Sequence, residues 1–199
     1  FLMPSKPSVT KRRSAGVSRP IRLRPPVSKS KPTWDMTSRS AGETDRLGQA
    51  LGLTLRGGEF LALLGTLGAG KTTLVRGIAK GLKADPSSVS SPTFVLAHEY
   101  RGRLDLVHVD LYRIRSPQEL ESTGLTEYLS KSAVAAVEWA DKLPGWWPDD
   151  RLAIEFRHRT IGSRAIRLSA HGPGSTGLLA RAKTKFSDLV AERRKVSPA

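Results

Sequence analysis

A chain of 199 residues suits one folded domain with tails. It contains no cysteine, which excludes disulfides and thiolate metal sites, and no apolar run of 18 residues, so no membrane segment is expected. The formal net charge is +15, but nine of the 33 lysines and arginines fall in residues 1–34, where there is no acid. Without that segment 24 basic and 18 acidic residues remain, a net charge of +6, so the rest of the chain is only mildly basic.

Residues 1–37 are rich in proline, serine, lysine and arginine, which predicts a basic, disordered N-terminal tail. Three explanations of this tail stay open. The first is that the segment is translated from upstream of the true start, since Met36 stands just ahead of the first organised segment. The second is an organelle transit peptide, and the third is an arm that binds RNA through its charge. We expect the domain itself in the cytoplasm, with organelle targeting by the tail as the alternative.

A regular pattern begins at Ser38. The run Ser40-Ala-Gly-Glu43 resembles a capping box, and Leu47, Ala50 and Leu51 follow at helical spacing. Gly57-Gly58 then interrupts the pattern. The apolar run Phe60–Leu64 after it is typical of a buried strand.

The run Gly65-Thr-Leu-Gly-Ala-Gly-Lys-Thr72 fits the phosphate-loop motif G-x-x-x-x-G-K-[ST] at every fixed position. It follows the predicted strand and precedes Leu74–Leu82, whose apolar residues have helical spacing. Glycines let successive N–H groups turn inward, and the helix directs its positive end at the same point. We therefore predict that ATP or ADP binds to Gly65, Thr66, Leu67, Gly68, Ala69, Gly70, Lys71, Thr72 and Thr73, with Lys71 on the β- and γ-phosphates and Thr72 on Mg²⁺.

The rest of the chain alternates between strands and helices. A hairpin is expected over residues 94–110, with strands Phe94–Tyr100 and Leu104–Asp110, and helices near Ser116-Pro117 and ending over residues 127–130. Further strands are predicted over 133–137, 152–156 and 165–168, and a peripheral helix within 176–195. The pattern favours an α/β fold: a single P-loop NTPase domain over residues 38–170, with a mainly parallel central sheet flanked by helices, and a helical C-terminal extension over 171–199.

Acids stand at two predicted strand ends, where α/β sheets bind their ligands. Asp110 and Glu138 are candidates for binding Mg²⁺ and for ordering the attacking water; solvated strand ends are the alternative. Thr93 follows Ser91-Pro92 in extended backbone and is a candidate switch residue, the alternative being an ordinary turn.

Aromatic and histidine side chains surround these candidates in the sequence. His108 is expected to be a packed, hydrogen-bonded histidine rather than a catalytic base. Trp139 either covers the nucleotide or fills the core, and Trp146 and Trp147 are expected to pack locally.

Four segments in this order resemble the bacterial TsaE (YjeE) family, the ATPase of tRNA threonylcarbamoyladenosine biosynthesis. They are Gly65–Gly77, Ser91-Pro-Thr-Phe94, His108-Val-Asp-Leu-Tyr-Arg113 and Val137-Glu-Trp-Ala-Asp141. The resemblance implies slow ATP hydrolysis, and joint action with TsaB and TsaD in modifying adenosine 37 of tRNAs that read codons beginning with A. Whether tRNA is contacted directly or through that complex stays open.

The resemblance also implies site residues. Lys71, Thr72, Asp110 and Glu138 keep the roles given above, Thr93 lies in a switch-like segment, and Thr44 and Arg164 lie near the nucleotide. One position departs from the family: Thr66 stands where an acid is usual. Backbone amides still form the phosphate loop there, but any contact that the acid makes is lost.

Two other functions compete with this interpretation. A small-molecule kinase needs an acceptor pocket and an arginine-rich lid, and no compact lid is visible in the sequence. A nucleotide-regulated RNA-binding module without significant hydrolysis is distinguished from an ATPase by RNA binding measured with and without ATP, together with a hydrolysis assay.

Overall fold

The computed structural model of the protein describes residues 30–124 and 132–196. A compact unit begins at Lys31. Its elements are β1 (Thr33–Ser38), α1 (Ala41–Thr54), β2 (Phe60–Leu64), α2 (Lys71–Gly81), η1 (Pro86–Ser88), β3 (Ala97–Tyr100), β4 (Leu106–Asp110), α3 (Pro117–Ser122), β5 (Val134–Glu138), η2 (Ala140–Lys142), β6 (Leu152–Thr160), β7 (Ser163–Ala170) and α5 (Pro173–Val196). The predicted helix ending over 127–130 lies outside the described residues.

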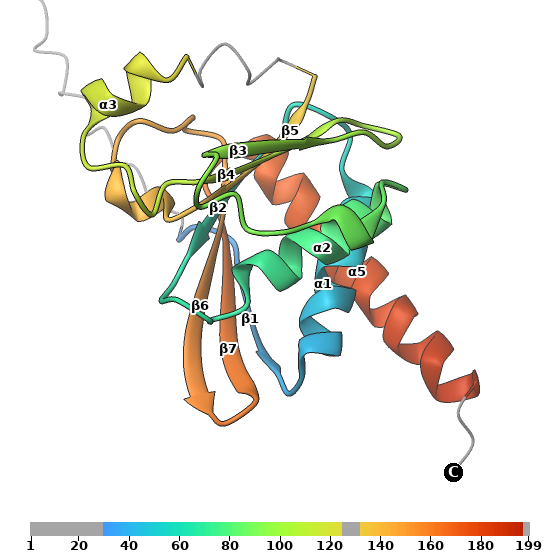
Figure 1. The fold of residues 1–199 in the computed structure, drawn as a ribbon. Helices are drawn as coiled ribbons and strands as arrows, with labels where there is room; N and C mark the ends of the chain where they lie inside the picture. Colours follow the sequence, from blue (N-terminus) through green and yellow to red (C-terminus); the bar gives the residue numbers. More distant parts are fainter. Residues whose placement is uncertain (1–29, 125–131, 197–199) are drawn as a thin grey trace, which may run out of the picture. The chain divides into compact units, whose positions relative to one another are not determined.

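One seven-stranded sheet runs through this unit in the order β1-β7-β6-β2-β5-β4-β3 (Figure 1). The central strands β6, β2, β5 and β4 pair in parallel, and the outer pairs are antiparallel. The predicted α/β fold with a parallel central sheet is confirmed, as is the predicted hairpin, whose strands are β3 and β4. Because β2, β4 and β5 are parallel, their carboxyl ends lie at one edge of the sheet, where the predicted acids stand.

Both faces of β2 are buried, as its continuous apolar sequence predicts. Leu61 and Leu63 belong to the larger core cluster, which packs the sheet against α1, α2 and α5. Phe60 and Ala62 point to the opposite face and join a second cluster with β4, β5 and the loop after η2. Trp147 lies in this second cluster, stacked on Phe60, so the predicted local packing of this tryptophan is confirmed.

Helix α2 is held close to α1 by glycines on both helices. A Cβ atom at Gly48 would lie 2.2 Å from the carbonyl oxygen of Leu74, and one at Gly77 would lie 2.0 Å from that of Asp45. The backbones can approach this closely only where no side chain intervenes. This contact fixes α2, and with it the phosphate loop that precedes it.

Strand β1 corrects the predicted boundary of the N-terminal tail. Thr33–Ser38 pairs with β7 along its whole length, so the tail does not extend to residue 37. Trp34 packs against Phe186 of α5, and Asp35 forms an ion pair with Arg167. The sequence interpretation missed β1 because only two apolar residues alternate in this short segment, directly after a basic, proline-rich stretch.

Other boundaries differ by a few residues. Strand β3 begins at Ala97 rather than Phe94, because the amides of Val95 and Leu96 both donate to the carbonyl oxygen of Pro92 and form a turn. Strand β4 begins at Leu106 rather than Leu104. Helix α5 is not peripheral, since its residues Leu178, Leu179 and Ala182 are buried in the larger core cluster. Among the described residues, no helix is long and apolar enough to cross a membrane.

Candidate active site

The phosphate loop lies between β2 and α2, and its glycines determine its path. Gly65, Gly68 and Gly70 have φ angles of 137°, 74° and 107°, which other residues rarely adopt. Gly70 is the N-cap of α2, so the loop ends at the positive end of this helix. Beside the loop lies a cavity of about 440 Å³, lined by Leu67, Gly68, Ala69, Gly70, Lys71, Thr72, Thr73, Ser91, Thr93, Asp110, Tyr112, Glu138 and Trp139.

Gly65 and Thr66 of the loop are not among the residues that line this cavity. They line a neighbouring cavity of about 590 Å³, together with Glu155 and Arg157 of β6. Trp139 lines both cavities and also packs against the second core cluster. Trp139 therefore lies both beside the phosphate loop and against the core.

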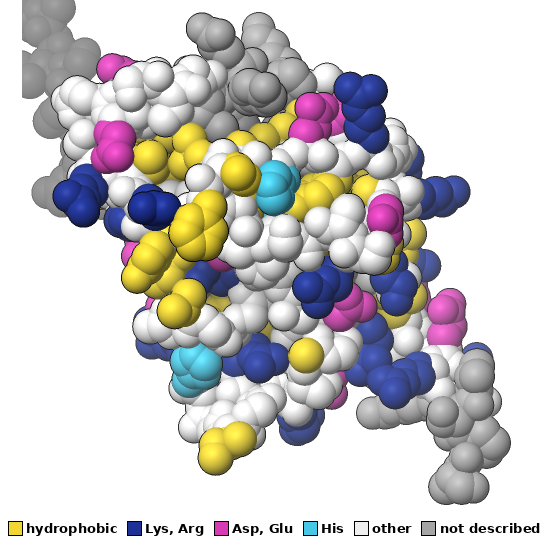
Figure 2. Space-filling view, viewed as in Figure 1, with side chains coloured by type: hydrophobic (Ala, Val, Ile, Leu, Met, Phe, Trp, Pro, Cys, Tyr) yellow, Lys and Arg dark blue, Asp and Glu magenta, His cyan; other side chains and the backbone are white. Residues whose placement is uncertain are grey.

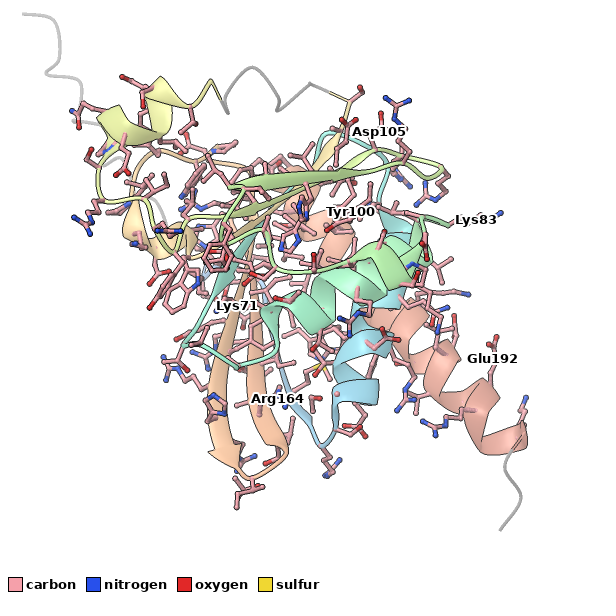
Figure 3. The ribbon with its side chains drawn as sticks, viewed as in Figure 1. Lys71, Lys83, Tyr100, Asp105, Arg164 and Glu192 are labelled. Atoms are coloured by element: carbon pink, nitrogen blue, oxygen red, sulfur yellow. The ribbon has the colours of Figure 1, made fainter. Side chains whose placement is uncertain are left out.

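Lys71 is nearly buried and points back along the loop (Figure 3). Its Nζ donates hydrogen bonds to the carbonyl oxygens of Gly65 and Thr66, at 2.8 and 3.0 Å, and lies 4.1 Å from the centroid of the Trp139 ring. Burial lowers the pKa of Lys71, against the attraction of Glu138 and Asp110, which acts to raise it. Among the described residues the ammonium group has backbone and aromatic partners but no direct ion pair, so it is available to an anionic ligand.

Glu138 receives two hydrogen bonds on one oxygen. Its Oε1 lies 2.8 Å from Oγ1 of Thr72, at the start of α2, and 2.9 Å from Nε2 of His108 on β4. The structure therefore brings together the predicted pair of Thr72 and Glu138. His108 is fully buried and hydrogen-bonded, as predicted.

Asp110 is held by the segment that precedes β3. Its Oδ2 accepts hydrogen bonds from Ser91 Oγ at 2.7 Å and Thr93 Oγ1 at 2.5 Å, while Oδ1 accepts from the amide of Tyr112. The predicted residue Thr93 therefore contacts a predicted acid. Ser91 was not singled out from the sequence, although it belongs to the quoted Ser-Pro-Thr-Phe motif.

Thr44 and Arg164 lie behind the phosphate loop rather than in the cavity. Arg164 Nη1 donates to Thr44 Oγ1 at 3.2 Å, and the Arg164 side chain packs beside Gly70, where a Cβ would lie 3.6 Å from its Nε (Figure 3). Thr44 Oγ1 also lies 2.8 Å from Oγ of Ser38, the last residue of β1. The sequence interpretation missed Ser38 because it lies where the tail was expected to end.

The donor set suits Mg²⁺ bound partly through phosphates. Within residues 30–124 and 132–196, no three acidic, histidine or cysteine side chains cluster closely enough to hold a metal ion alone. Mg²⁺ in nucleotide sites uses one or two carboxylates, with substrate phosphates and water completing its shell. Thr72, Glu138 and Asp110 offer oxygen donors of this kind at one cavity.

Apolar side chains are exposed around the mouth of the cavity. Leu67 and Tyr112 line it and are 77% and 49% exposed, and Phe94 and Val95, next to Thr93, are 87% and 61% exposed. Figure 2 shows hydrophobic side chains gathered on this face of the molecule. A rim of this kind is typical of a protein contact surface.

The parallel sheet and the glycine loop that leads from β2 into α2 define a P-loop NTPase domain. Comparison with known proteins narrows this class. A family model described as "Threonylcarbamoyl adenosine biosynthesis protein TsaE" matches residues 38–166, so the chain belongs to the TsaE family. This confirms the family resemblance; β1 up to residue 37 and the whole of α5 lie outside the matched range.

Individual relatives agree with the family assignment. A tRNA threonylcarbamoyladenosine biosynthesis protein TsaE from Treponema pallidum is 36% identical over 132 residues, covering 66% of this chain and 97% of that protein. The protein of the same name from Nostoc sp. is 40% identical over 131 residues, covering 63% and 79%. A crystal structure of YdiB from Bacillus subtilis matches with a TM-score of 0.65 and 29% identity, covering 79% of this chain and 98% of that one.

Proposed function

We propose that this chain is an Mg²⁺-dependent ATPase that acts with TsaB and TsaD in threonylcarbamoyl modification of adenosine 37, in tRNAs that read codons beginning with A. The observation that carries the hydrolytic part is the meeting of a phosphate-loop lysine, a threonine hydroxyl and two strand-end carboxylates at one cavity. Family membership and the names of the relatives support the tRNA part. A role on tRNA favours the cytoplasm as its place of action.

Each side chain has a task in this proposal. The Lys71 ammonium exchanges its carbonyl partners for the β- and γ-phosphates, which are stronger acceptors because they are charged. Thr72, Asp110 and Glu138 would hold Mg²⁺, directly or through water, and the ion would neutralise charge on the phosphates. Glu138 orients the water that attacks the γ-phosphorus, and the bond from that phosphorus to the bridging oxygen breaks.

The residues around the loop respond to the nucleotide or support the loop. Thr93 donates a hydrogen bond to Asp110, and a bound γ-phosphate would change this hydrogen bond, as in switch segments. Arg164 stabilises the loop from behind through Gly70 and Thr44. Trp139 covers the loop. Thr66 acts through its backbone, because its carbonyl oxygen accepts a hydrogen bond from Lys71 Nζ. This contact does not need the acidic side chain that is usual at this position.

The exposed apolar rim supports a protein partner at the mouth of the cavity. Leu67 belongs to the phosphate loop and Phe94 follows Thr93, so a protein bound there contacts both segments that respond to nucleotide. Such a partner would accelerate a hydrolysis that we expect to be slow in the isolated chain. A kinase is less well supported, because the described residues around the cavity offer no arginine-rich lid; an RNA-binding module without hydrolysis leaves the two carboxylates unused.

Reconstitution with purified TsaB, TsaD and a substrate tRNA tests the proposal. Phosphate release and modified adenosine are measured in the same reaction, with each protein omitted in turn. We expect slow hydrolysis by the chain alone, stimulation by the partners, and modification only in the full mixture. Phosphate transfer to a small metabolite supports the kinase instead, and ATP-dependent RNA binding without turnover supports the binding module.

A further inference from the structure

His108 is a buried polar residue to which the proposed chemistry gives no task. It lies in the middle of β4, opposite Ala136 on β5 and His98 on β3, and has no solvent exposure. One of its nitrogens, Nε2, lies 2.9 Å from Glu138 Oε1. The other, Nδ1, is buried and has no hydrogen-bond partner among the described residues. Since a buried polar ring is costly unless it is hydrogen-bonded, we take the hydrogen bond to Glu138 as the reason for a histidine at this position.

The hydrogen of this contact can be assigned from the chemistry of its partner. An ionised carboxylate only accepts hydrogen bonds, so Nε2 carries the hydrogen and donates it to Oε1. The Thr72 hydroxyl donates to the same oxygen. In the described part of the chain, Oε2 of Glu138 accepts no hydrogen bond and remains the free oxygen of this carboxylate.

The two donors on Oε1 differ in how firmly they are placed. Thr72 is itself a proposed ligand of Mg²⁺, so its hydroxyl oxygen has a second task once nucleotide binds. His108 is enclosed by the central strands and is not part of the cavity lining. Its imidazole therefore remains a fixed donor to Oε1 in either state.

We propose that His108 is a positioning residue. It fixes the Glu138 carboxylate through Oε1 and so keeps Oε2 available for the reaction when Thr72 turns to the metal. This inference rests on the proposed ATPase function. It assigns to His108 an effect on turnover rather than on nucleotide affinity, because the imidazole does not reach the nucleotide cavity.

Two variants of His108 separate positioning from packing. His108→Gln retains an amide N–H near the place of Nε2, whereas His108→Phe fills the volume without a donor. His98→Phe, on the neighbouring strand and without contact to Glu138, is the matched control. In the complex with TsaB and TsaD we expect His108→Phe to lower kcat at least tenfold, with KM for ATP and Kd for ADP within twofold of wild type. His108→Gln should recover part of kcat, and His98→Phe should retain it.

Two kinetic results overturn the proposal: a kcat of His108→Phe within twofold of wild type, or equal losses in kcat and in nucleotide affinity. A second readout needs no turnover. The ¹⁵N signal of the His108 Nε2–H group in the nucleotide-free protein should shift in Glu138→Ala and stay in place in Glu99→Gln. If the wild-type complex hydrolyses no ATP, the ATPase proposal fails separately, and an unshifted signal in Glu138→Ala then overturns the positioning role as well.

Discussion

Asp110 and Glu138 are direct partners across the parallel pair of β4 and β5, yet they are held by different segments. Glu138 receives its hydroxyl hydrogen bond from Thr72 at the start of α2, whereas Asp110 receives hydrogen bonds from Ser91 and Thr93 before β3. One acid is therefore coupled to the phosphate loop and the other to the segment beside the apolar rim. In the proposed ATPase, a change at the γ-phosphate that alters one set of bonds would therefore reach the carboxylate on the neighbouring strand.

Glu138→Gln and Asp110→Asn are expected to leave ADP affinity within a few-fold of wild type. Mg²⁺-dependent hydrolysis in the complex should fall by at least about tenfold, because each variant removes a negative charge that serves the metal or the attacking water. Nucleotide affinity is measured by calorimetry and turnover by phosphate release. Glu99→Gln, an exposed acid on β3, is the control. Wild-type turnover in both active-site variants shows that these acids are structural strand ends.

Lys71→Ala should abolish tight binding of ATP and ADP. The side chain is the nearly buried cation of the loop, and its replacement leaves the phosphates without a charged partner. Lys80→Ala is the matched control, since Lys80 lies on the same helix, is half exposed and pairs only loosely with Asp45, at 3.8 Å. Titration of tryptophan fluorescence with ADP compares the two. Equal affinities in both variants contradict a phosphate loop.

The sequence predicted the parts of the fold that local patterns determine. Phe60–Leu64 and the apolar run before Glu138 are continuous because both faces of the sheet are covered, so these strands were evident. Strand β1 was not, since its pairing partner β7 lies more than 120 residues away and supplies the contacts that Trp34 and Asp35 make. The turn at Phe94 depends on which amides reach the carbonyl oxygen of Pro92, which residue types do not reveal.

The site divides in the same way. The phosphate loop is a contiguous motif, and acids at strand ends follow from parallel pairing, so Lys71, Asp110 and Glu138 were found from the sequence. The contact of His108 with Glu138 depends on the register of β4 against β5 and on side-chain direction. Arg164 reaches Thr44 across 120 residues, and only the family resemblance suggested that either lies near the nucleotide.

Gly77→Ala should destabilise the protein although alanine favours helices. The added Cβ would lie 2.0 Å from the carbonyl oxygen of Asp45, so α2 must move away from α1. We expect the free energy of unfolding to fall by about 2–3 kcal/mol, as for overpacked cores. Gly42→Ala is the control: it lies exposed in the first turn of α1 and meets only Ser40 Oγ at 3.8 Å, so stability should rise by up to about 1 kcal/mol. The free energies of unfolding of both variants are measured by urea denaturation. Equal changes in the two variants contradict the close glycine contact between α1 and α2.

Asp150 stabilises the start of α5 in a pH-dependent way. Its carboxylate accepts hydrogen bonds from the amides of Gly174 and Ser175, at 2.7 and 2.8 Å. Desolvation acts to raise the pKa of Asp150, but the hydrogen bonds from Ser175 and Gly174 together outweigh it and lower the pKa. The stabilisation is therefore present above the unfolded pKa, about 3.9, and is lost as the pH falls through the lower folded value.

Asp150→Ala should accordingly lower the free energy of unfolding by about 1 kcal/mol at neutral pH, as for lost helix caps. The difference from wild type should shrink as the pH falls below about 4. Asp149→Ala, a neighbouring exposed acid, is the control and should change little at any pH. Urea titrations at several pH values make the comparison. A difference that stays constant from neutral to acid pH contradicts the charged cap.

Two truncations distinguish β1 from the basic segment before it. Deletion of residues 1–29 leaves β1 whole, and we expect unchanged melting temperature and ADP affinity. Low-salt RNA binding should weaken, since eight positive charges are lost. Deletion of residues 1–35 also removes Trp34 and Asp35, and with them the contacts to Phe186 and Arg167 and half of the pairing with β7. A loss of about 2 kcal/mol lowers the melting temperature of a chain this size by about 4–8 °C. Equal melting temperatures for the two truncations show that the first half of β1 adds no stability.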